Sequence, residues 1–248
     1  MMNNEFAHRL AVVSGASSGI GLAVVEHLLQ QGASVLAMSR SEGPLGELQQ
    51  RYPVHLHWHA GDVTRQADLA ALAARAKSLG PIDYLVPNAG IAQLADSLDP
   101  AAFERQWAVN GAGALNTLNA LRNNLATPAA VVFIGTFLSS LSFPGLAAYI
   151  ASKAALKAMT RTLATELASQ QVRINMVSPG PTATPIWASL GLPTEQLQDV
   201  AATVSQRLLG GQFLDPDTVA EVVLFQLSQG SRGVFGQDWV VDNGFTLS

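Results

Sequence analysis

Cysteine is absent from the 248-residue chain, and charge is scarce. Without cysteine the chain can form neither disulfides nor thiolate ligands for a metal ion. Charged residues make up 13% of the sequence, where about 25% is usual. The net charge is −4 with both signs dispersed, so there is no basic patch for nucleic acid or anionic lipid.

Long apolar runs and targeting signals are lacking as well. No apolar run approaches the roughly 20 residues that cross a membrane. Residues Met1 to Glu5 carry neither the basic nor the apolar segment of a secretory signal. No linker, repeat or charge run divides the chain, so we expect one domain over residues 1–248, in the cytoplasm and without a membrane or nucleic-acid partner.

Three of the five histidines alternate along one expected strand. Side chains of His55, His57 and His59 would share a face, where a metal site is conceivable. No other histidine or carboxylate is placed to complete such a site. The pattern therefore favours a strand near the sheet edge, with these polar residues outward and Leu56 and Trp58 inward, and we expect no metal.

Short apolar runs alternate with segments of helical periodicity. Strands are expected at about residues 10–14, 34–38, 54–59, 83–87, 130–135, 172–178 and 238–241, and helices between them include about 100–125 and 146–168. This alternation predicts the α/β class, as a single-domain, Rossmann-type doubly wound parallel sheet with helices on both faces.

A glycine motif follows the first expected strand and opens a helix. Gly15, Gly19 and Gly21 have a spacing that allows a tight turn, a close approach of the backbone to a pyrophosphate, and tight packing of helix on strand. The free N–H groups at the start of a helix favour an anion. A glycine turn that binds nothing is the simpler alternative, but the strand and helix that the motif requires are both expected here.

Tyr149 and Lys153 lie four residues apart in an alanine-rich stretch, so both side chains should emerge from one helix face. A neighbouring ammonium stabilises phenolate and would lower the tyrosine pKa from about 10 toward neutrality. Such a phenol can exchange protons with an alcohol or a carbonyl. The alternative is a surface helix that carries Tyr149 and Lys153 at this spacing by chance, without a function.

Further motifs follow in order: Asp62-Val63, Asn88-Ala89-Gly90, Asn110, Pro179-Gly180 and Gly236 to Gly244. With them, essentially the whole chain resembles a short-chain dehydrogenase/reductase of about 250 residues. The resemblance implies four catalytic residues, Asn110, Thr136, Tyr149 and Lys153. It also implies a cofactor site of Gly15, Ser17, Ser18, Gly19, Ile20, Gly21, Ser39, Arg40, Asp62, Val63, Asn88, Ala89, Gly90, Tyr149, Lys153, Pro179, Gly180, Thr182 and Thr184.

One departure from the family pattern matters for the chemistry. The catalytic serine expected 13 residues before the tyrosine is Thr136. Threonine keeps the hydroxyl, but its methyl group stiffens the side chain and occupies space beside the carbonyl, so we expect a narrower or shifted substrate range. Ser139 is the alternative hydroxyl donor to substrate, although an ordinary loop serine is the simpler interpretation.

The choice of nicotinamide cofactor depends on the end of the second strand. Ser39 stands where NAD-preferring members carry an acidic residue, and Arg40 could bind a 2′-phosphate. We therefore expect NADP(H). If Arg40 only stacks on adenine or faces solvent, NAD(H) would also serve.

A substrate lid is expected between Pro185 and Phe213, where Ile186 and Trp187 offer apolar surface to an apolar or aromatic ketone. The same residues could simply pack the lid onto the body. A large part of the family reduces 3-oxoacyl chains on acyl carrier protein. That reading is less favoured, because the helix ends expected to meet an acidic carrier have only Arg122 and Arg173 nearby.

The mechanism implied by the resemblance is hydride transfer between nicotinamide and a carbonyl or secondary alcohol. Thr136 and Tyr149 would bind the oxygen, Lys153 would lower the tyrosine pKa and hold the ribose, and Asn110 would orient a water. A catalytically silent nucleotide-sensing protein is the alternative from another class, motivated by Thr136. The intact Asn110, Tyr149 and Lys153 argue against it.

Assembly is also expected from the scarcity of charge. The expected helices at 100–125 and around Tyr149 are rich in small and apolar residues, more than one sheet face can cover. A second copy of the chain would cover the remainder. The resemblance implies pairing through these two helices into a homo-oligomer, commonly a tetramer.

Overall fold

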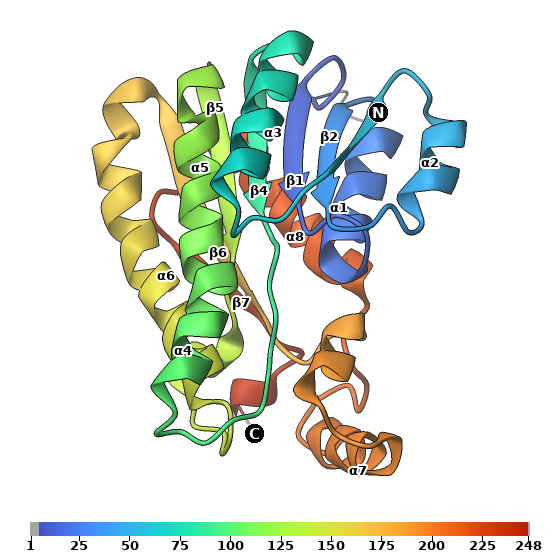
Figure 1. Cartoon of the computed structure of the whole chain (residues 1–248), viewed down its shortest axis with the longest axis vertical. Helices are drawn as coiled ribbons and strands as arrows, with labels where there is room; N and C mark the ends of the chain where they lie inside the picture. The colour runs from blue at the N-terminus through green and yellow to red at the C-terminus, as the bar shows by residue number, and fades with distance from the viewer. Residues whose placement is uncertain (1–4, 248) are drawn as a thin grey trace.

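The computed structural model describes residues 5–247, so the expectation for the N-terminal segment concerns residues 1–4 that lie outside the described part. Its centre is a seven-stranded sheet in the order β3-β2-β1-β4-β5-β6-β7, with every neighbouring pair parallel (Figure 1). The strands are β1 (Leu10–Ser14), β2 (Ser34–Ser39), β3 (Leu56–Ala60), β4 (Ile82–Pro87), β5 (Leu125–Ile134), β6 (Val172–Pro179) and β7 (Asp238–Val241). The predicted fold class is confirmed.

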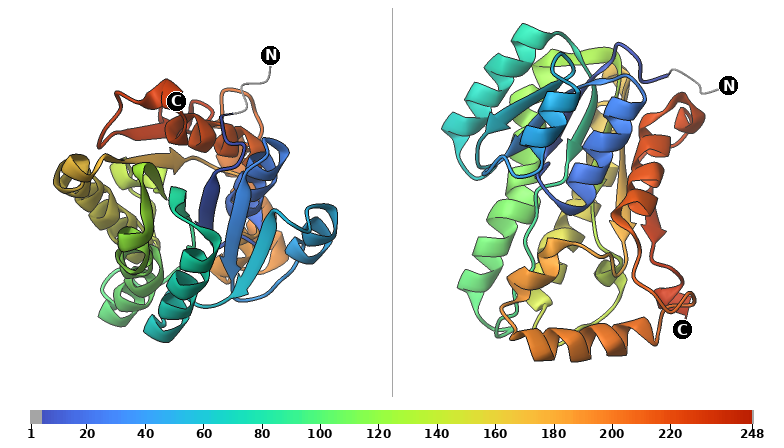
Figure 2. Two further views of the ribbon diagram at one scale, coloured as in Figure 1. Left: turned by 90° about the horizontal axis from the view of Figure 1, so that it is seen from above. Right: turned by 90° about the vertical axis from the view of Figure 1, so that its right-hand side faces the viewer.

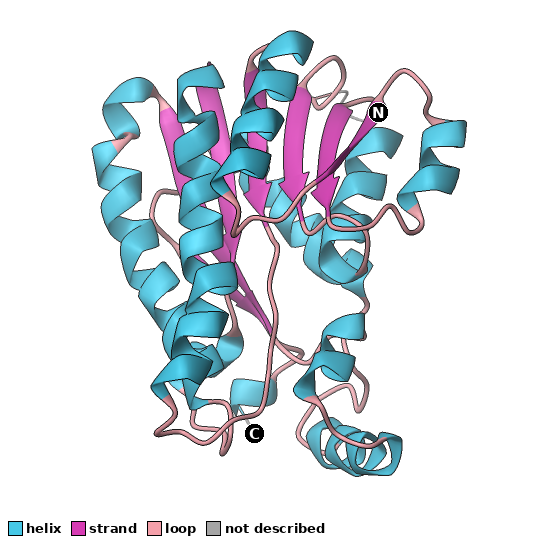
Figure 3. Cartoon of the chain, viewed as in Figure 1, coloured by secondary structure: helices cyan, strands magenta, loops and turns pink. Residues whose placement is uncertain are grey.

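Helices cover both faces of the sheet (Figure 3). One apolar core lies between the sheet and α1 and α8, and a second lies between the sheet and α3, α5 and α6. Strands β1, β4 and β6 are buried along their whole length, as expected for parallel strands covered on both sides. The helices are α1 (Gly19–Gln30), α2 (Leu45–Arg51), α3 (Gln66–Leu79), α4 (Pro100–Trp107), α5 (Ala114–Leu121), α6 (Ala147–Glu166), α7 (Thr194–Ser205) and α8 (Pro216–Leu227).

The expected helix at 100–125 is in fact four elements, the last of them a 3-10 turn, η2 (Arg122–Asn124). A π-helical turn, η1 (Ala108–Gly113), separates α4 from α5, and β5 begins at Leu125, several residues before the expected strand. A Cβ at Gly111 would lie 2.0 Å from the Trp107 ring, so the indole packs directly against the glycine backbone. Such turns often occur at functional sites, and this one carries Asn110.

The histidine strand, β3, lies at the edge of the sheet, as expected. Leu56 is buried, but Trp58 is only half-buried, and its indole donates a hydrogen bond to Ser39 Oγ. No group of three or more potential metal ligands is found within residues 5–247. In the same part of the chain, no helix has the length and apolarity that crossing a membrane requires.

The segment 185–213 contains η5 (Pro185–Leu190) and α7 and lies beyond the carboxyl ends of the strands (Figure 2). In this region the loops after β1, β4, β5 and β6 converge. Ligands of open α/β sheets bind at this edge. The fold therefore places the predicted motifs around one space.

Candidate active site

A cavity of about 560 Å³ opens at the carboxyl ends of the strands. It is lined by the glycine loop, the ends of β2 and β6, the loops after β3, β4 and β5, the start of α6 and the segment 185–213. All but three of the predicted site residues line it. Gly21 and Asn110 lie behind the lining, and Ser139 is outside it, which agrees with its interpretation as a loop serine.

The glycine loop has the geometry of an anion cradle. Gly15 and Gly19 have φ values of +65° and +53°, which side chains rarely adopt. A Cβ on Gly21 would lie 2.3 Å from the Gly15 carbonyl oxygen, so only glycine permits the close turn. Helix α1 begins at Gly19 and presents its free N–H groups at the cavity. These features fit a dinucleotide pyrophosphate.

Asn88 supports this loop from the end of β4. Its side-chain amide donates to the carbonyl oxygens of Ser14 and Gly15, at 3.1 and 3.0 Å. Its main-chain N–H donates to Ser14 Oγ at 3.2 Å. Asn88 lines the cavity, but both amide hydrogens are used to hold the loop, so its structural task is to fix the cradle.

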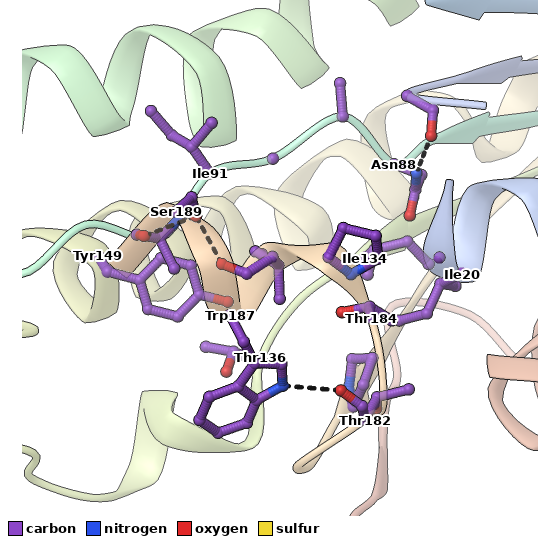
Figure 4. Close-up of a pocket in the computed structure, with 18 of the residues that line it drawn as sticks. Ile20, Asn88, Ile91, Ile134, Thr136, Tyr149, Thr182, Thr184, Trp187 and Ser189 are labelled. Atoms are coloured by element: carbon purple, nitrogen blue, oxygen red, sulfur yellow. Dashed lines mark hydrogen bonds between the residues drawn. The ribbon is translucent and has the colours of Figure 1, made fainter. Parts of the chain in front are cut away.

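The phenol of Tyr149 and the hydroxyl of Thr136 face the same space (Figure 4), and the Thr136 hydroxyl is placed to act on the Tyr149 pKa through a hydrogen bond. Thr136 precedes η3 (Phe137–Ser140), and its oxygen accepts from the N–H of Leu138 at 3.3 Å. That acceptor contact leaves the Thr136 proton available for the Tyr149 oxygen or for a substrate oxygen. Two hydroxyl groups therefore converge at one point of the cavity.

Tyr149 and Lys153 lie on one face of α6, as predicted, and both are buried. Lys153 Nζ donates to the Ile134 carbonyl oxygen at 2.7 Å. Burial lowers the pKa of Lys153 to about 8. Burial also raises the pKa of Tyr149, and the hydrogen bond with Thr136 offsets only part of this rise. The expectation that Lys153 draws the tyrosine pKa toward neutrality is therefore wrong for the cofactor-free protein, because desolvation disfavours both charged forms.

Asn110 is fully buried, and its side chain is occupied by protein groups. Oδ1 accepts from the N–H of Ile91 at 2.8 Å, and Nδ2 donates to the Ile91 carbonyl and to Ser152 Oγ at 2.9 and 3.0 Å. Ser152 Oγ in turn donates to the Tyr149 carbonyl at 2.7 Å. Asn110 thus connects the loop after β4 to the helix that carries Tyr149. A water could meet this side chain only at the remaining lone pair of Oδ1.

The two residues predicted to select the cofactor differ in burial: Ser39 is buried and Arg40 is exposed. Ser39 Oγ donates to the Ser41 carbonyl at 2.7 Å and accepts from Trp58 Nε1 at 3.0 Å, so it is already engaged. Arg40 lines the cavity with an exposed side chain. Burial alone would raise the pKa of Asp62, but hydrogen bonds from Thr64 and the positive charges of Arg40 and Arg65 together lower it. Arg40 therefore lies close enough to Asp62 to act on the same end of the cavity.

The other end of the cavity is apolar, and most of its residues were not identified from the sequence. Aromatic and aliphatic side chains from the loops and from segment 185–213 enclose the space beside Tyr149, and Trp187 is anchored by donation to the Thr182 carbonyl at 2.8 Å. Phe245, near the C-terminus, packs edge-on against Phe137 at 5.0 Å. No local pattern marks such residues. The missed members are Ala92, Leu94, Phe137, Leu138, Phe143, Leu146, Ser189, Val204 and Phe245.

Comparison with known proteins agrees with this geometry. Residues 15–246 match a family model described as enoyl-(acyl carrier protein) reductase. A cis-4-hydroxycyclohexanecarboxylate dehydrogenase from Sinomonas cyclohexanicum is 36% identical over 99% of both chains, and carbonyl reductase [NADPH] 2 from Sus scrofa is 29% identical over the full length of both. The crystal structure of a short-chain dehydrogenase/reductase from Mycobacterium marinum superposes with a TM-score of 0.89 at 26% identity, covering both chains completely.

A glycine cradle beside a buried tyrosine and lysine defines a nicotinamide-dependent oxidoreductase. The chain belongs to the short-chain dehydrogenase/reductase family. Its activity is NAD(P)-dependent oxidoreduction between an alcohol and a carbonyl.

Proposed function

We propose that the protein is an NADP(H)-dependent carbonyl reductase or alcohol dehydrogenase whose substrate is an apolar ketone or the corresponding alcohol. The observation that carries the proposal is that the hydroxyl groups of Thr136 and Tyr149 face one cavity, between the glycine cradle and its apolar end. The glycine loop, Arg40 and the end of β6 would hold the cofactor, with Thr182 and Thr184 placed to meet its carboxamide and its phosphates.

The side chains divide the reaction among them. When bound, NADPH supplies a hydride to the carbonyl carbon. Thr136 donates a hydrogen bond to the carbonyl oxygen, and Tyr149 transfers its phenol proton to that oxygen as negative charge develops. Lys153 then stabilises the phenolate of Tyr149. Solvent returns a proton to this phenolate along a path beside Asn110. The raised pKa of Tyr149 keeps the phenol protonated at neutral pH, which suits the direction of ketone reduction.

The preference for an apolar ketone is supported by the walls of the cavity. Within the described residues, the charged side chains that line it are Arg40, Asp62 and Lys153, and the first two lie at the cradle end. A substrate carboxylate or phosphate at the apolar end would be desolvated without a partner. Two substrate classes compete with this proposal. One is a cyclic alcohol carboxylate, as in the name of the Sinomonas relative, and the other is an acyl chain held by a carrier protein.

A substrate panel tests the proposal directly. We expect NADPH oxidation with uncharged cyclic and aryl ketones, and much lower kcat/KM with 4-oxocyclohexanecarboxylate and with 3-oxoacyl or enoyl thioesters. Cyclohexanone and 4-oxocyclohexanecarboxylate form the sharpest pair, because they differ only in the charged group. A preference for the carboxylate, or turnover of thioesters alone, would refute the apolar-ketone class. No turnover of any carbonyl or alcohol would favour a nucleotide-sensing protein.

Arg40→Ala should weaken NADPH binding far more than NADH binding. A charge-assisted hydrogen bond to phosphate contributes about 1.5–3 kcal/mol, so we expect the Kd for NADPH to rise about 10- to 150-fold. The Kd for NADH should change little. Fluorescence titration of both cofactors measures the difference.

Arg65→Ala is the matched control for Arg40, because Arg65 also acts on Asp62 but does not line the cavity. It should leave both dissociation constants nearly unchanged. Equal weakening of NADPH and NADH by Arg40→Ala would mean that Arg40 does not read the 2′-phosphate, and dual cofactor use would follow.

We also propose a homo-oligomer, with α4 and α6 in the interface. These helices pack side by side, and Phe103 on α4 and Met159 on α6 are each 38% exposed. Ala158 is exposed on the same helix as Met159. An arginine there would place an unpaired charge in an apolar contact, which strongly opposes association.

Ala158→Arg should therefore lower the mass measured by light scattering to that of a smaller species. Ala71→Arg on α3, also an exposed helical alanine, is the control and should leave the mass unchanged. A wild-type protein that is monomeric at micromolar concentration would contradict the proposal.

A further inference from the structure

Three consecutive residues after β4 are held in the same unusual way, with one side chain binding both backbone groups of each residue. Asn110 binds the N–H and the carbonyl of Ile91, at 2.8 and 2.9 Å. Gln106, on α4, binds the N–H and the carbonyl of Gln93, both at 3.1 Å. Both side chains are fully buried in the body of the protein. We call the three residues Ile91–Gln93 the strap. Its first and last residues are therefore held by side chains from the body of the protein.

The middle residue of the strap is held from the other side. The N–H of Ala92 donates to Ser189 Oγ at 3.3 Å, and Ser189 Oγ lies 2.8 Å from the Ala92 carbonyl oxygen (Figure 4). Ser189 belongs to η5, in the segment 185–213 that covers the cavity. The strap thus receives two clamps from the body and one from the lid.

The Ser189 hydroxyl has two competing acceptors. Its oxygen is 2.8 Å from the Ala92 carbonyl and 2.6 Å from the Ile186 carbonyl, one turn earlier in η5. A hydroxyl has one proton and can fully satisfy only one of them. When the bond to Ala92 breaks, the proton therefore has an acceptor within its own helix, and the donor is not left unsatisfied. Breaking the contact of Ser189 with Ala92 therefore exchanges one neutral hydrogen bond for another and hydrates Ala92.

The other hydrogen bonds of this part of the lid are local. Within residues 5–247, the hydrogen bonds of residues 185–205 stay between residues 182 and 208, apart from those of Ser189 to Ala92. No residue of η5 is buried, and α7 buries only Val204. Partly buried apolar side chains of the lid also pack against the apolar end of the cavity, but among the described residues the contact of Ser189 with Ala92 is the hydrogen bonding that ties residues 185–205 to the strap.

We propose that Ser189 is a latch that holds the lid closed over the reacting groups by clamping Ala92. The proposal rests on the proposed function, since the lid covers the ketone site described above. Ser189 is a positioning residue: it acts through the strap, whose neighbouring residue Ile91 is bound by Asn110, and it performs no chemistry. The latch closes the cavity when both hydrogen bonds between Ser189 and Ala92 form, and it releases the cavity when they exchange for the bond to Ile186, as repeated turnover requires.

Amide hydrogen exchange in the cofactor-free protein tests the latch without any substrate. Ser189→Ala should accelerate exchange of the Ala92 amide about two- to tenfold, the range that one neutral hydrogen bond supports. The Ile91 and Gln93 amides, bound by Asn110 and Gln106, should keep their wild-type rates. Ser189→Thr retains the hydroxyl and should restore protection. Unchanged exchange at Ala92 in Ser189→Ala would overturn the latch.

Steady-state kinetics tests the gating role. In Ser189→Ala we expect the KM for ketone to rise about two- to tenfold with kcat within about twofold, because saturating substrate can still draw the lid closed. Thr203→Ala is the matched control. It removes another lid hydroxyl, which donates to Asp199 within α7 and makes no contact to the strap. KM in that variant should stay at the wild-type value.

The outcomes separate the latch from the proposed function. Faster Ala92 exchange with an unchanged KM would refute gating, and a loss of kcat at constant KM would assign Ser189 to the chemical step instead. If the wild-type protein reduces no ketone, the proposed function fails, and the exchange comparison still decides whether Ser189 clamps Ala92.

Discussion

Tyr149→Phe is expected to reduce ketone turnover by about 10²–10⁴-fold, the range that a positioned general acid contributes. The substitution removes one oxygen from a buried ring and keeps its shape, so packing and cofactor affinity should change little. Steady-state assays with NADPH and a cyclic ketone measure kcat, and fluorescence titration measures cofactor binding. The loss should appear in kcat and in kcat/KM alike, because the proton is transferred only in the transition state.

Tyr84→Phe is the control for this experiment. Tyr84 is also buried, and burial raises its pKa to about 12, yet it lies on β4 away from the cavity. Removing its hydroxyl tests whether loss of any buried phenol impairs the enzyme. We expect near wild-type turnover. Retained turnover in Tyr149→Phe would refute the proposed mechanism, whereas equal losses in both variants would indicate a general effect on folding.

Much of this fold could be predicted from local patterns. The strand, glycine turn and helix around Gly15 are encoded within about 20 neighbouring residues, and the alternation of strands and helices indicates a doubly wound sheet. The helix carrying Tyr149 was predicted almost to its ends. The interruption at η1, where the Trp107 ring packs on Gly111, was not predicted, because a helical period in the sequence cannot reveal it.

The spacing of Tyr149 and Lys153 in the sequence could not by itself predict the directions of their pKa shifts. The four-residue interval between Tyr149 and Lys153 correctly predicted a shared face, but it suggested that charge attraction would dominate. Both groups are buried by segments distant in sequence, and the Lys153 amine binds the Ile134 carbonyl. Desolvation therefore sets the direction of both pKa shifts in the free protein.

The side chains that support the site could not be identified from the sequence for the same reason. Asn88 matched a cofactor motif, yet its amide holds the glycine loop across a separation of more than 70 residues. Ser189 carries no motif, and its relation to Ala92 exists only once the lid folds over the strap. Sequence patterns identify groups that do chemistry more readily than groups that position them, because positioning depends on contacts between distant segments.

Thr136 is the position where this chain departs from its family, and its substitution has the second large expected effect. Thr136→Ala should lower kcat/KM for ketone reduction about 10²–10³-fold, the cost of losing one donor to a developing oxyanion. Thr136→Ser keeps the donor and removes the methyl group, so it should retain activity and accept bulkier ketones. A series of cyclic ketones of increasing ring size, assayed with all three proteins, measures both effects.

The pH profile distinguishes a catalytic Thr136 from one that only fills space. The hydrogen bond with Thr136 lowers the pKa of Tyr149, so its removal should raise that pKa further. Alcohol oxidation requires the phenolate, and the rising limb of its pH profile should therefore move to higher pH in Thr136→Ala but not in Thr136→Ser. Ser139→Ala should leave the profile unchanged, because Ser139 lies outside the cavity lining. Loss of activity in Ser139→Ala, with none in Thr136→Ala, would transfer the donor role to Ser139.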